Sequence, residues 1–163
     1  MSILKFENRT PRTLSEMQAY MFDKDKTSPD AVFGIGVHEK YAAEQMEFVQ
    51  RMWYREGLTH EYIQVIFAFD VGILLPFPML VHICRNIGYA LINDQRQVLG
   101  AIHYKDTDKI HCHYMINYVG MDGSLYRQNS SIYSYMMAVD KILVQYGLNP
   151  ICSNTEISMC QAS

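Results

Sequence analysis

The sequence predicts an α+β protein, built on a central antiparallel β-sheet with helices packed mainly on one face. Residues 62–70 alternate between two sets of side chains, as in a strand with two different faces. Two apolar runs within residues 98–118 enclose a polar stretch, which is typical of a β-hairpin. Residues 41–56 instead show helical spacing of apolar side chains. We expect the strand and the hairpin to pair antiparallel, with the helices on one face and a helix-free working surface on the other.

Local signals mark where the helices begin and end. Thr13 to Glu16 matches a capping box, Gly57 is a natural helix stop, and Pro76 and Pro78 fit the first turn of a later helix. The expected elements, in chain order, are a helix from residue 13 to about residue 22, a strand at 31–37, a helix at 41–57, a strand at 62–70, a helix at 77–92, the hairpin at 98–118, a tight turn at Asp122-Gly123, a helix at 131–146 capped by Ser130 or Ser131, and a short strand at 148–152.

The length and composition fit one globular domain. The chain has 163 residues, and we expect a single domain over 1–163 with its core at about 13–150 and a tail at 153–163. The net charge of −3 shows that the chain as a whole is not basic. A surface that binds nucleic acid must therefore be a local patch of positive charge. There is no signal peptide, no long apolar span and no C-x-x-C pair, which favours a reduced, soluble, cytoplasmic protein without membrane contact.

Three of the six histidines fall on the predicted hairpin. A turn centred on Thr107 places His103 opposite His111. Because strand side chains alternate between faces, His103, His111, His113 and Asn117 would share one face. Three imidazoles converging from two strands suit a divalent metal and leave positions open for water or a substrate oxygen. The alternative is a polar sheet face that holds no ion.

The hairpin and the N-terminal region together resemble the plasmid mobilisation relaxases of the MobP/MobA type, within the HUH endonucleases. In that family an upstream histidine, an Asp-Thr turn, an H-x-H pair and an asparagine follow one another. His103, Asp106-Thr107-Asp108, His111, His113 and Asn117 match this order. Further, softer matches are residues 20–27 to the family's N-terminal tyrosine motif, 62–70 to its central strand, 122–123 to a turn and 140–148 to the helix that closes the nuclease core.

The resemblance implies a relaxase-like fold and a reaction. A relaxase nicks single-stranded DNA at a transfer origin through a 5′-phosphotyrosine intermediate, in plasmid or mobile-element mobilisation and conjugation. Tyr20 would be the nucleophile, with Tyr41, Tyr54 and Tyr62 as competitors. The alternative for Tyr20 is an aromatic residue at the end of a helix, packed on the core. The family implies Mn²⁺ or Mg²⁺ on the three histidines, although three imidazoles would also accept Zn²⁺ or Ni²⁺. The partners would be the single-stranded transfer origin and accessory mobilisation proteins.

Several other residues are candidates for supporting roles. Metal-bound histidines usually donate their second ring N–H to a carboxylate or carbonyl, which favours Asp106, Asp108 and Asp70; the two loop aspartates equally fit ordinary turn chemistry. Asn117 could orient water or phosphate, or be a polar residue at the edge of a strand. Arg12, Lys24 and Lys26 are close to Tyr20 in sequence and could track a DNA backbone, or form a solvated charged surface.

The chain departs from the family pattern in places. Lys109 stands where the family often has another histidine, and Ala68-Phe69 stands where it often has Ser-Phe. The low basicity is also unusual for a protein that handles DNA. Two alternatives therefore remain: a catalytically reduced relaxase-derived module that binds DNA or protein, and a metal-dependent phosphoesterase that uses activated water.

Overall fold

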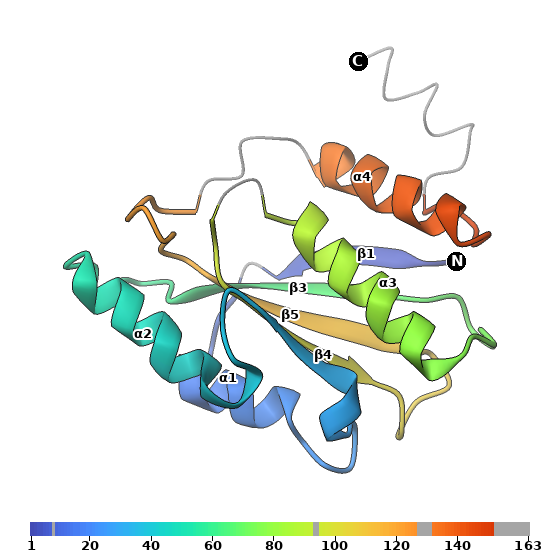
Figure 1. Ribbon diagram of the computed structural model, residues 1–163, viewed down its shortest axis with the longest axis horizontal. Coiled ribbons are helices and arrows are strands. Elements are labelled where there is room, and N and C mark those ends of the chain that lie inside the picture. The colour runs from blue at the N-terminus through green and yellow to red at the C-terminus, as the bar shows by residue number, and fades with distance from the viewer. Residues whose placement is uncertain (8, 93–94, 127–131, 152–163) are drawn as a thin grey trace.

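Five strands form one antiparallel sheet in the order β1-β3-β5-β4-β2, flanked by four α-helices (Figure 1). The computed structural model describes residues 1–7, 9–92, 95–126 and 132–151. The elements are β1 (Ile3–Glu7), α1 (Leu14–Met21), β2 (Val32–Ile35), α2 (Ala42–Met52), β3 (Tyr62–Ala68), α3 (Phe77–Ala90), β4 (Val98–His103), β5 (His111–Asn117) and α4 (Ile132–Gln145), with short 3-10 helices at Pro29–Ala31 and Glu39–Tyr41. The predicted α+β class with an antiparallel sheet is confirmed.

The register of the hairpin is the one that the sequence predicts. His103 on β4 pairs with His111 on β5, and Ala101 pairs with His113. On the other side of β5, Ala68 of β3 pairs with His111. All three histidines therefore lie on one face of the central strands, while Tyr114 belongs to the core on the other face.

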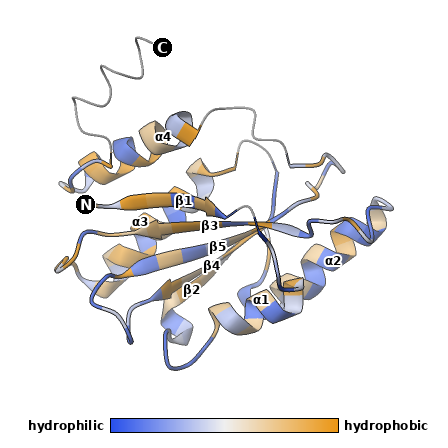
Figure 2. Cartoon of the chain, turned by 180° about the vertical axis from the view of Figure 1, so that it is seen from behind, coloured by the Kyte–Doolittle hydropathy of each residue, from blue (hydrophilic) through white to orange (hydrophobic). Residues whose placement is uncertain are grey.

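Helices cover both faces of the sheet, so the predicted helix-free face is wrong. The helices α3 and α4 pack on the face that carries Ile102 and Tyr114. The helices α1 and α2 lie on the histidine face, where Met17 and Met46 join Leu99 in a second core (Figure 1). Leu99 is apolar and lies on the same face of the sheet as the histidines. Burying its side chain is favourable, and the apolar stripe of a helix can cover it. Figure 2 shows hydrophilic and hydrophobic residues mixed along both α1 and α2.

One strand and one helix end also differ from the prediction. The strand β1 was not predicted; it is a short edge strand whose Leu4 pairs with Phe67 of β3. The helix α2 ends at Met52, before Gly57, because the chain turns at Tyr54 with a φ of 53°. The predicted capping box is confirmed: Thr13 Oγ1 accepts from the Glu16 amide at 3.2 Å, and the Glu16 carboxylate accepts from the Thr13 amide at 2.9 Å.

Near the C-terminus, residues 148–150 form no strand, in contrast to the prediction. The predicted cap at Ser130 or Ser131 and the tail at 153–163 lie outside the described residues. Among the helices that the structure describes, none has both the length and the apolar composition to cross a lipid bilayer.

Candidate metal centre

Three histidine rings converge beside the hairpin loop, where β4 ends and β5 begins. One ring nitrogen from each of His103, His111 and His113 lies within 4.8 Å of the others. The ring centroids are 4.4 Å apart for His103 and His113, 5.0 Å for His111 and His113, and 5.4 Å for His103 and His111. The cross-strand pairing and the two-residue period of a strand produce this arrangement. The structure therefore brings together the three histidines that the sequence singled out.

Two of the rings donate hydrogen bonds to backbone carbonyls. His103 Nε2 lies 3.0 Å from the Met21 carbonyl oxygen, and His111 Nδ1 lies 3.0 Å from the Lys109 carbonyl oxygen. Because a carbonyl oxygen only accepts, these two nitrogens carry the ring protons. The lone pairs of His103 Nδ1 and His111 Nε2 are then available to a metal, in the arrangement that metal-bound histidines usually adopt.

The third ring is held by a residue that the sequence analysis missed. His113 Nδ1 lies 3.2 Å from the side-chain amide of Gln64, on β3. The amide of a glutamine can present either its oxygen or its nitrogen. If the Gln64 oxygen faces the ring, His113 Nδ1 donates a hydrogen bond to it. The lone pair of His113 Nε2 is then available to a metal. The signal for Gln64 was its place as a polar residue on the inward face of a strand, in phase with Tyr62 and Ile66.

His113 Nε2 is buried and has no hydrogen-bond partner among the described residues. Leaving such an atom unpaired costs free energy, so buried polar atoms of this kind are normally bonded to something. The atom belongs to one of the three rings that converge, and a cation among those rings would satisfy it. The chemistry of this donor set therefore fits a divalent transition-metal ion.

Burial keeps two of the rings neutral. Burial, together with positive charge on His103, His111, Lys26 and Arg12, lowers the pKa of His113 to about 3. Burial also lowers the pKa of His103. Both rings are therefore neutral at neutral pH, and the ring nitrogen without a proton can bind a metal.

Tyr20 lies beside the histidines, at the end of α1. Its ring centroid is 5.5 Å from that of His113 and 5.8 Å from that of His103, with the rings edge to face. Two cations contact the same aromatic ring: the Arg12 guanidinium lies 4.3 Å from its centroid, and Lys26 Nζ lies 4.7 Å from it. Tyr20 is half-buried, so part of the residue is open to solvent.

The competing tyrosines are placed differently. Tyr41 and Tyr54 are exposed, and the ring of Tyr41 lies against His38. Tyr62 is fully buried in the core beneath α1, and burial raises its pKa. Tyr114 is turned to the opposite face, as the alternation predicts, and donates to the Cys84 carbonyl at 2.7 Å.

Asn117 belongs to the packing of α2 rather than to the histidine cluster. It is fully buried, and its amide oxygen accepts from Gln50 at 2.9 Å and from the Val119 amide at 3.1 Å. Its amide nitrogen donates to Gln97 at 2.9 Å and to the Met46 carbonyl at 3.3 Å. With these four bonds the amide has no remaining capacity for a substrate.

The predicted acidic residues are spread over two places. Asp70 forms an ion pair with the Met1 amino group at 2.7 Å, and that hydrogen bond lowers the pKa of the carboxyl. Asp106 and Asp108 are exposed in the hairpin loop, and the charge of Asp106 acts on His103 to raise its pKa against the effect of burial. The hydrogen bonds expected from carboxylates are made instead by two backbone carbonyls and Gln64.

Comparison with known proteins gives a family and a fold. The model of a family described as relaxase, MobA/VirD2-like, nuclease domain, matches residues 20–148. No curated protein sequence matches significantly. A structure concerned with the molecular basis of vancomycin resistance transfer in Staphylococcus aureus is 9% identical with a TM-score of 0.62, over 91% of this chain and 95% of that chain. The conjugative relaxase TrwC, in a metal-bound complex with oriT DNA, is 14% identical with a TM-score of 0.52, over 89% of this chain and 71% of that chain. At such identities the likeness shows the shared fold.

Proposed function

This chain belongs to the relaxase family as a MobA/VirD2-like nuclease domain, and we propose that it nicks and rejoins single-stranded DNA at the transfer origin of a plasmid or other mobile element, in the cytoplasm. Tyr20 is the nucleophile of this proposal, and His103, His111 and His113 are its metal ligands. The observation that carries it is the ring of Tyr20, edge-on to His113 at 5.5 Å and to His103 at 5.8 Å.

The proposed reaction exchanges one phosphate ester for another. The Tyr20 hydroxyl oxygen attacks the scissile phosphorus and loses its proton, while the bond from phosphorus to the 3′-oxygen breaks. The 3′-oxygen takes up a proton and leaves as a free hydroxyl, and the 5′-phosphate of the downstream strand stays on the tyrosine. Because the ester is conserved, the reverse attack by a 3′-hydroxyl rejoins DNA without an added energy source.

Arg12 and Lys26 supply positive charge where the reaction needs it. A tyrosine hydroxyl has an ordinary pKa of about 10, so it is a weak nucleophile until it loses its proton. Both cations contact the Tyr20 ring, at 4.3 Å and 4.7 Å from its centroid. They would stabilise the phenolate and bind the anionic phosphate that it attacks.

The histidines would hold a divalent ion, which supplies positive charge to the non-bridging oxygens of the scissile phosphate when it is bound. Manganese or magnesium is the expected ion in this family, with zinc or nickel as other occupants of three imidazoles. The unpaired, buried Nε2 of His113 supports this assignment. Asp106 remains a candidate for a supporting role at the metal site, because its negative charge acts to raise the pKa of His103.

A covalent trapping assay tests the proposal. The protein is incubated with Mn²⁺ and a pool of random-sequence single-stranded oligonucleotides that carry one dye at the 5′ end and another at the 3′ end. After denaturation, the 3′ dye should migrate with the protein and the 5′ dye should not, because the tyrosine retains the downstream fragment. Tyr20→Phe should abolish the adduct, whereas Tyr89→Phe, on the exposed side of α3, should not.

The other outcomes identify the alternatives. Cleavage without a covalent adduct would point to a phosphoesterase that uses water. Binding without cleavage would point to a relaxase-derived binding module. An adduct that survives in Tyr20→Phe but is lost in Tyr41→Phe would identify Tyr41 as the nucleophile instead of Tyr20.

A further inference from the structure

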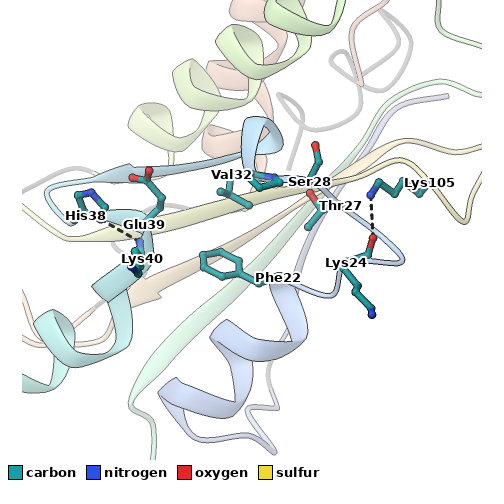
Figure 3. A pocket seen from close by; sticks show the side chains of 10 residues that line it. Phe22, Lys24, Thr27, Ser28, Val32, His38, Glu39, Lys40 and Lys105 are labelled. Carbon is teal, nitrogen blue, oxygen red and sulfur yellow. Dashed lines mark hydrogen bonds between the residues drawn. The ribbon is translucent and has the colours of Figure 1, made fainter.

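A pocket of about 500 Å³ opens beside the end of α1, between the loop that follows this helix and the segment before α2 (Figure 3). We propose that this pocket, called here the Phe22 pocket, seats one nucleobase of the single-stranded DNA, next to the nucleotide at the scissile phosphate. The inference rests on the proposed function. It adds a specificity subsite outside the histidine and tyrosine cluster.

The size and floor of the Phe22 pocket suit a flat apolar ring. Phe22, Pro29 and Val32 contribute its apolar lining, and Figure 3 shows the Phe22 ring in the middle of the pocket, below Val32. Ligand sites of roughly 300–1,000 Å³ with mostly apolar walls hold small organic groups. An exposed aromatic face is also the usual partner of a base in single-stranded DNA, because every base can stack on it.

Thr27 provides a polar group inside this apolar site. The residue is 3% exposed, it lines the pocket, and its hydroxyl has no hydrogen-bond partner among the described residues. A buried hydroxyl without a partner is unfavourable. A purely hydrocarbon ligand would leave it unpaired, whereas the edge of a base carries donors and acceptors that can pair with it.

The lysines on the rim of the pocket favour binding of the DNA phosphates outside it. Lys24 and Lys105 stand at one end and Lys40 at the other (Figure 3), in a chain of net charge −3. Lys105 Nζ donates to the Lys24 carbonyl at 2.9 Å, which fixes that end. Glu39 also lines the pocket, and its carboxylate would repel a phosphate in the interior. The backbone of the DNA would therefore follow the lysines, and the base would point inward.

The same loop connects the Phe22 pocket to the proposed nucleophile. Phe22 is the residue that caps α1, two positions after Tyr20. Lys26, whose ammonium contacts the Tyr20 ring, lies between the pocket residues Lys24 and Thr27. The Lys26 carbonyl accepts from the amides of Tyr104 and Lys105, directly after His103. A strand with its phosphate at Tyr20 thus has the pocket beside it for a neighbouring base.

The test compares how much the bases contribute to binding in different variants. Affinity for oligo-thymidylate is divided by affinity for an abasic oligonucleotide of the same length, in EDTA and in the Tyr20→Phe background so that nothing is cleaved. Phe22→Ala and the isosteric Thr27→Val should each lower this ratio, by about fivefold or more for the lost stacking partner. Phe48→Ala removes an aromatic ring of α2 that is 64% exposed and does not line the pocket, and it should leave the ratio unchanged.

Crosslinking of the wild-type chain gives a second readout that needs no variant. Oligonucleotides with 5-iodouracil should crosslink to the peptide that contains Phe22 upon irradiation. A ratio unchanged in both folded variants overturns the proposal; if the variants fail to fold, crosslinks confined to other peptides overturn it. If the Tyr20 adduct forms but the affinity ratio is unchanged, or the crosslinks lie only in other peptides, the base site is wrong and the proposed function stands. If no adduct forms and single-stranded DNA does not bind, both the base site and the proposed function are wrong.

Discussion

His103 donates a hydrogen bond from Nε2 to the carbonyl oxygen of Met21, over 3.0 Å. Met21 is the last residue of α1 and the neighbour of Tyr20 in the chain, so one ring joins the candidate metal centre to the helix that carries the proposed nucleophile. A change in the histidine cluster should therefore affect the position of Tyr20 as well as metal binding.

Metal binding should stabilise the fold through His103. A ligand that binds only the folded state at 100 times its dissociation constant adds about 2.7 kcal/mol to the free energy of unfolding. We expect Mn²⁺ to raise the melting temperature of the wild-type chain and EDTA to reverse this. His103→Asn should lose the response, whereas His82→Asn, on α3 against Tyr146, should keep it. An unchanged response in His103→Asn would remove this histidine from the ligand set.

Gln64 should control metal affinity without binding the metal. Removing a residue that orients a metal-bound histidine typically weakens metal binding by about 10- to 100-fold. Gln64→Leu should show a loss of this size in a calorimetric titration. Gln64→Glu keeps an oxygen that accepts from His113 Nδ1, and it should retain most of the affinity. Equal affinity of the leucine variant and the wild type would contradict this role.

The metal-free protein should lose stability in acid because His113 is neutral in the fold. Its pKa is about 3 when folded, against an ordinary value of 6.5, so the unfolded chain binds the extra proton first. The contribution of His113 is complete above pH 6.5 and is lost as the pH falls from 6.5 towards 3. Over that window one such proton changes the free energy of unfolding by up to about 1.4 kcal/mol per pH unit.

Denaturant unfolding in EDTA across this pH range measures the effect. The lowered pKa of His103 acts in the same direction, so the comparison needs a His113→Gln variant with His103 intact. The variant should show a shallower dependence on pH than the wild type. Parallel curves would show that His113 does not cause the acid sensitivity.

Asn117 should matter for stability and not for chemistry. Asn117→Ala leaves buried partners without hydrogen bonds, including Gln50 on α2 and Gln97 just before β4. Leaving buried polar groups unpaired costs about 1–3 kcal/mol each, so a total loss of about 3 kcal/mol is expected from denaturant unfolding. Metal affinity should be unchanged where the variant is folded. A selective loss of DNA cleavage in a fully folded variant would instead restore a substrate role for Asn117.

Arg12 and Lys26 should determine part of the salt dependence of DNA binding. Each contact with a phosphate of single-stranded DNA adds about 0.7 to the slope of log affinity against log salt. Arg12→Gln and Lys26→Gln should each make the slope shallower by about this amount, measured by fluorescence anisotropy. Lys5→Gln is the matched control, because Lys5 pairs with Glu7 at 2.7 Å on the edge strand β1. Equal slopes for all three variants would show that the cations at Tyr20 do not contact DNA.

The predictions from the sequence were correct where local patterns decide the structure. The alternation of side chains along 98–118 fixed which residues share a face, and the structure pairs His103 with His111 as that pattern requires. The capping box at Thr13 likewise formed as predicted. The edge strand β1 was missed because its five residues become a strand through pairing with β3, whose partner residues are 57 to 65 positions away in the chain.

The sequence by itself determined that three imidazoles gather on one side of a hairpin, because the period of a strand is a property of each residue and its neighbours. The tertiary structure alone decided what lies over them. It packed α1 and α2 against Leu99 and Met115, brought Tyr20 and Gln64 to the rings, and took up the amide of Asn117 in the packing of α2. Such contacts join segments far apart in the chain, and they depend on how apolar area is buried across the whole molecule, which no local pattern specifies.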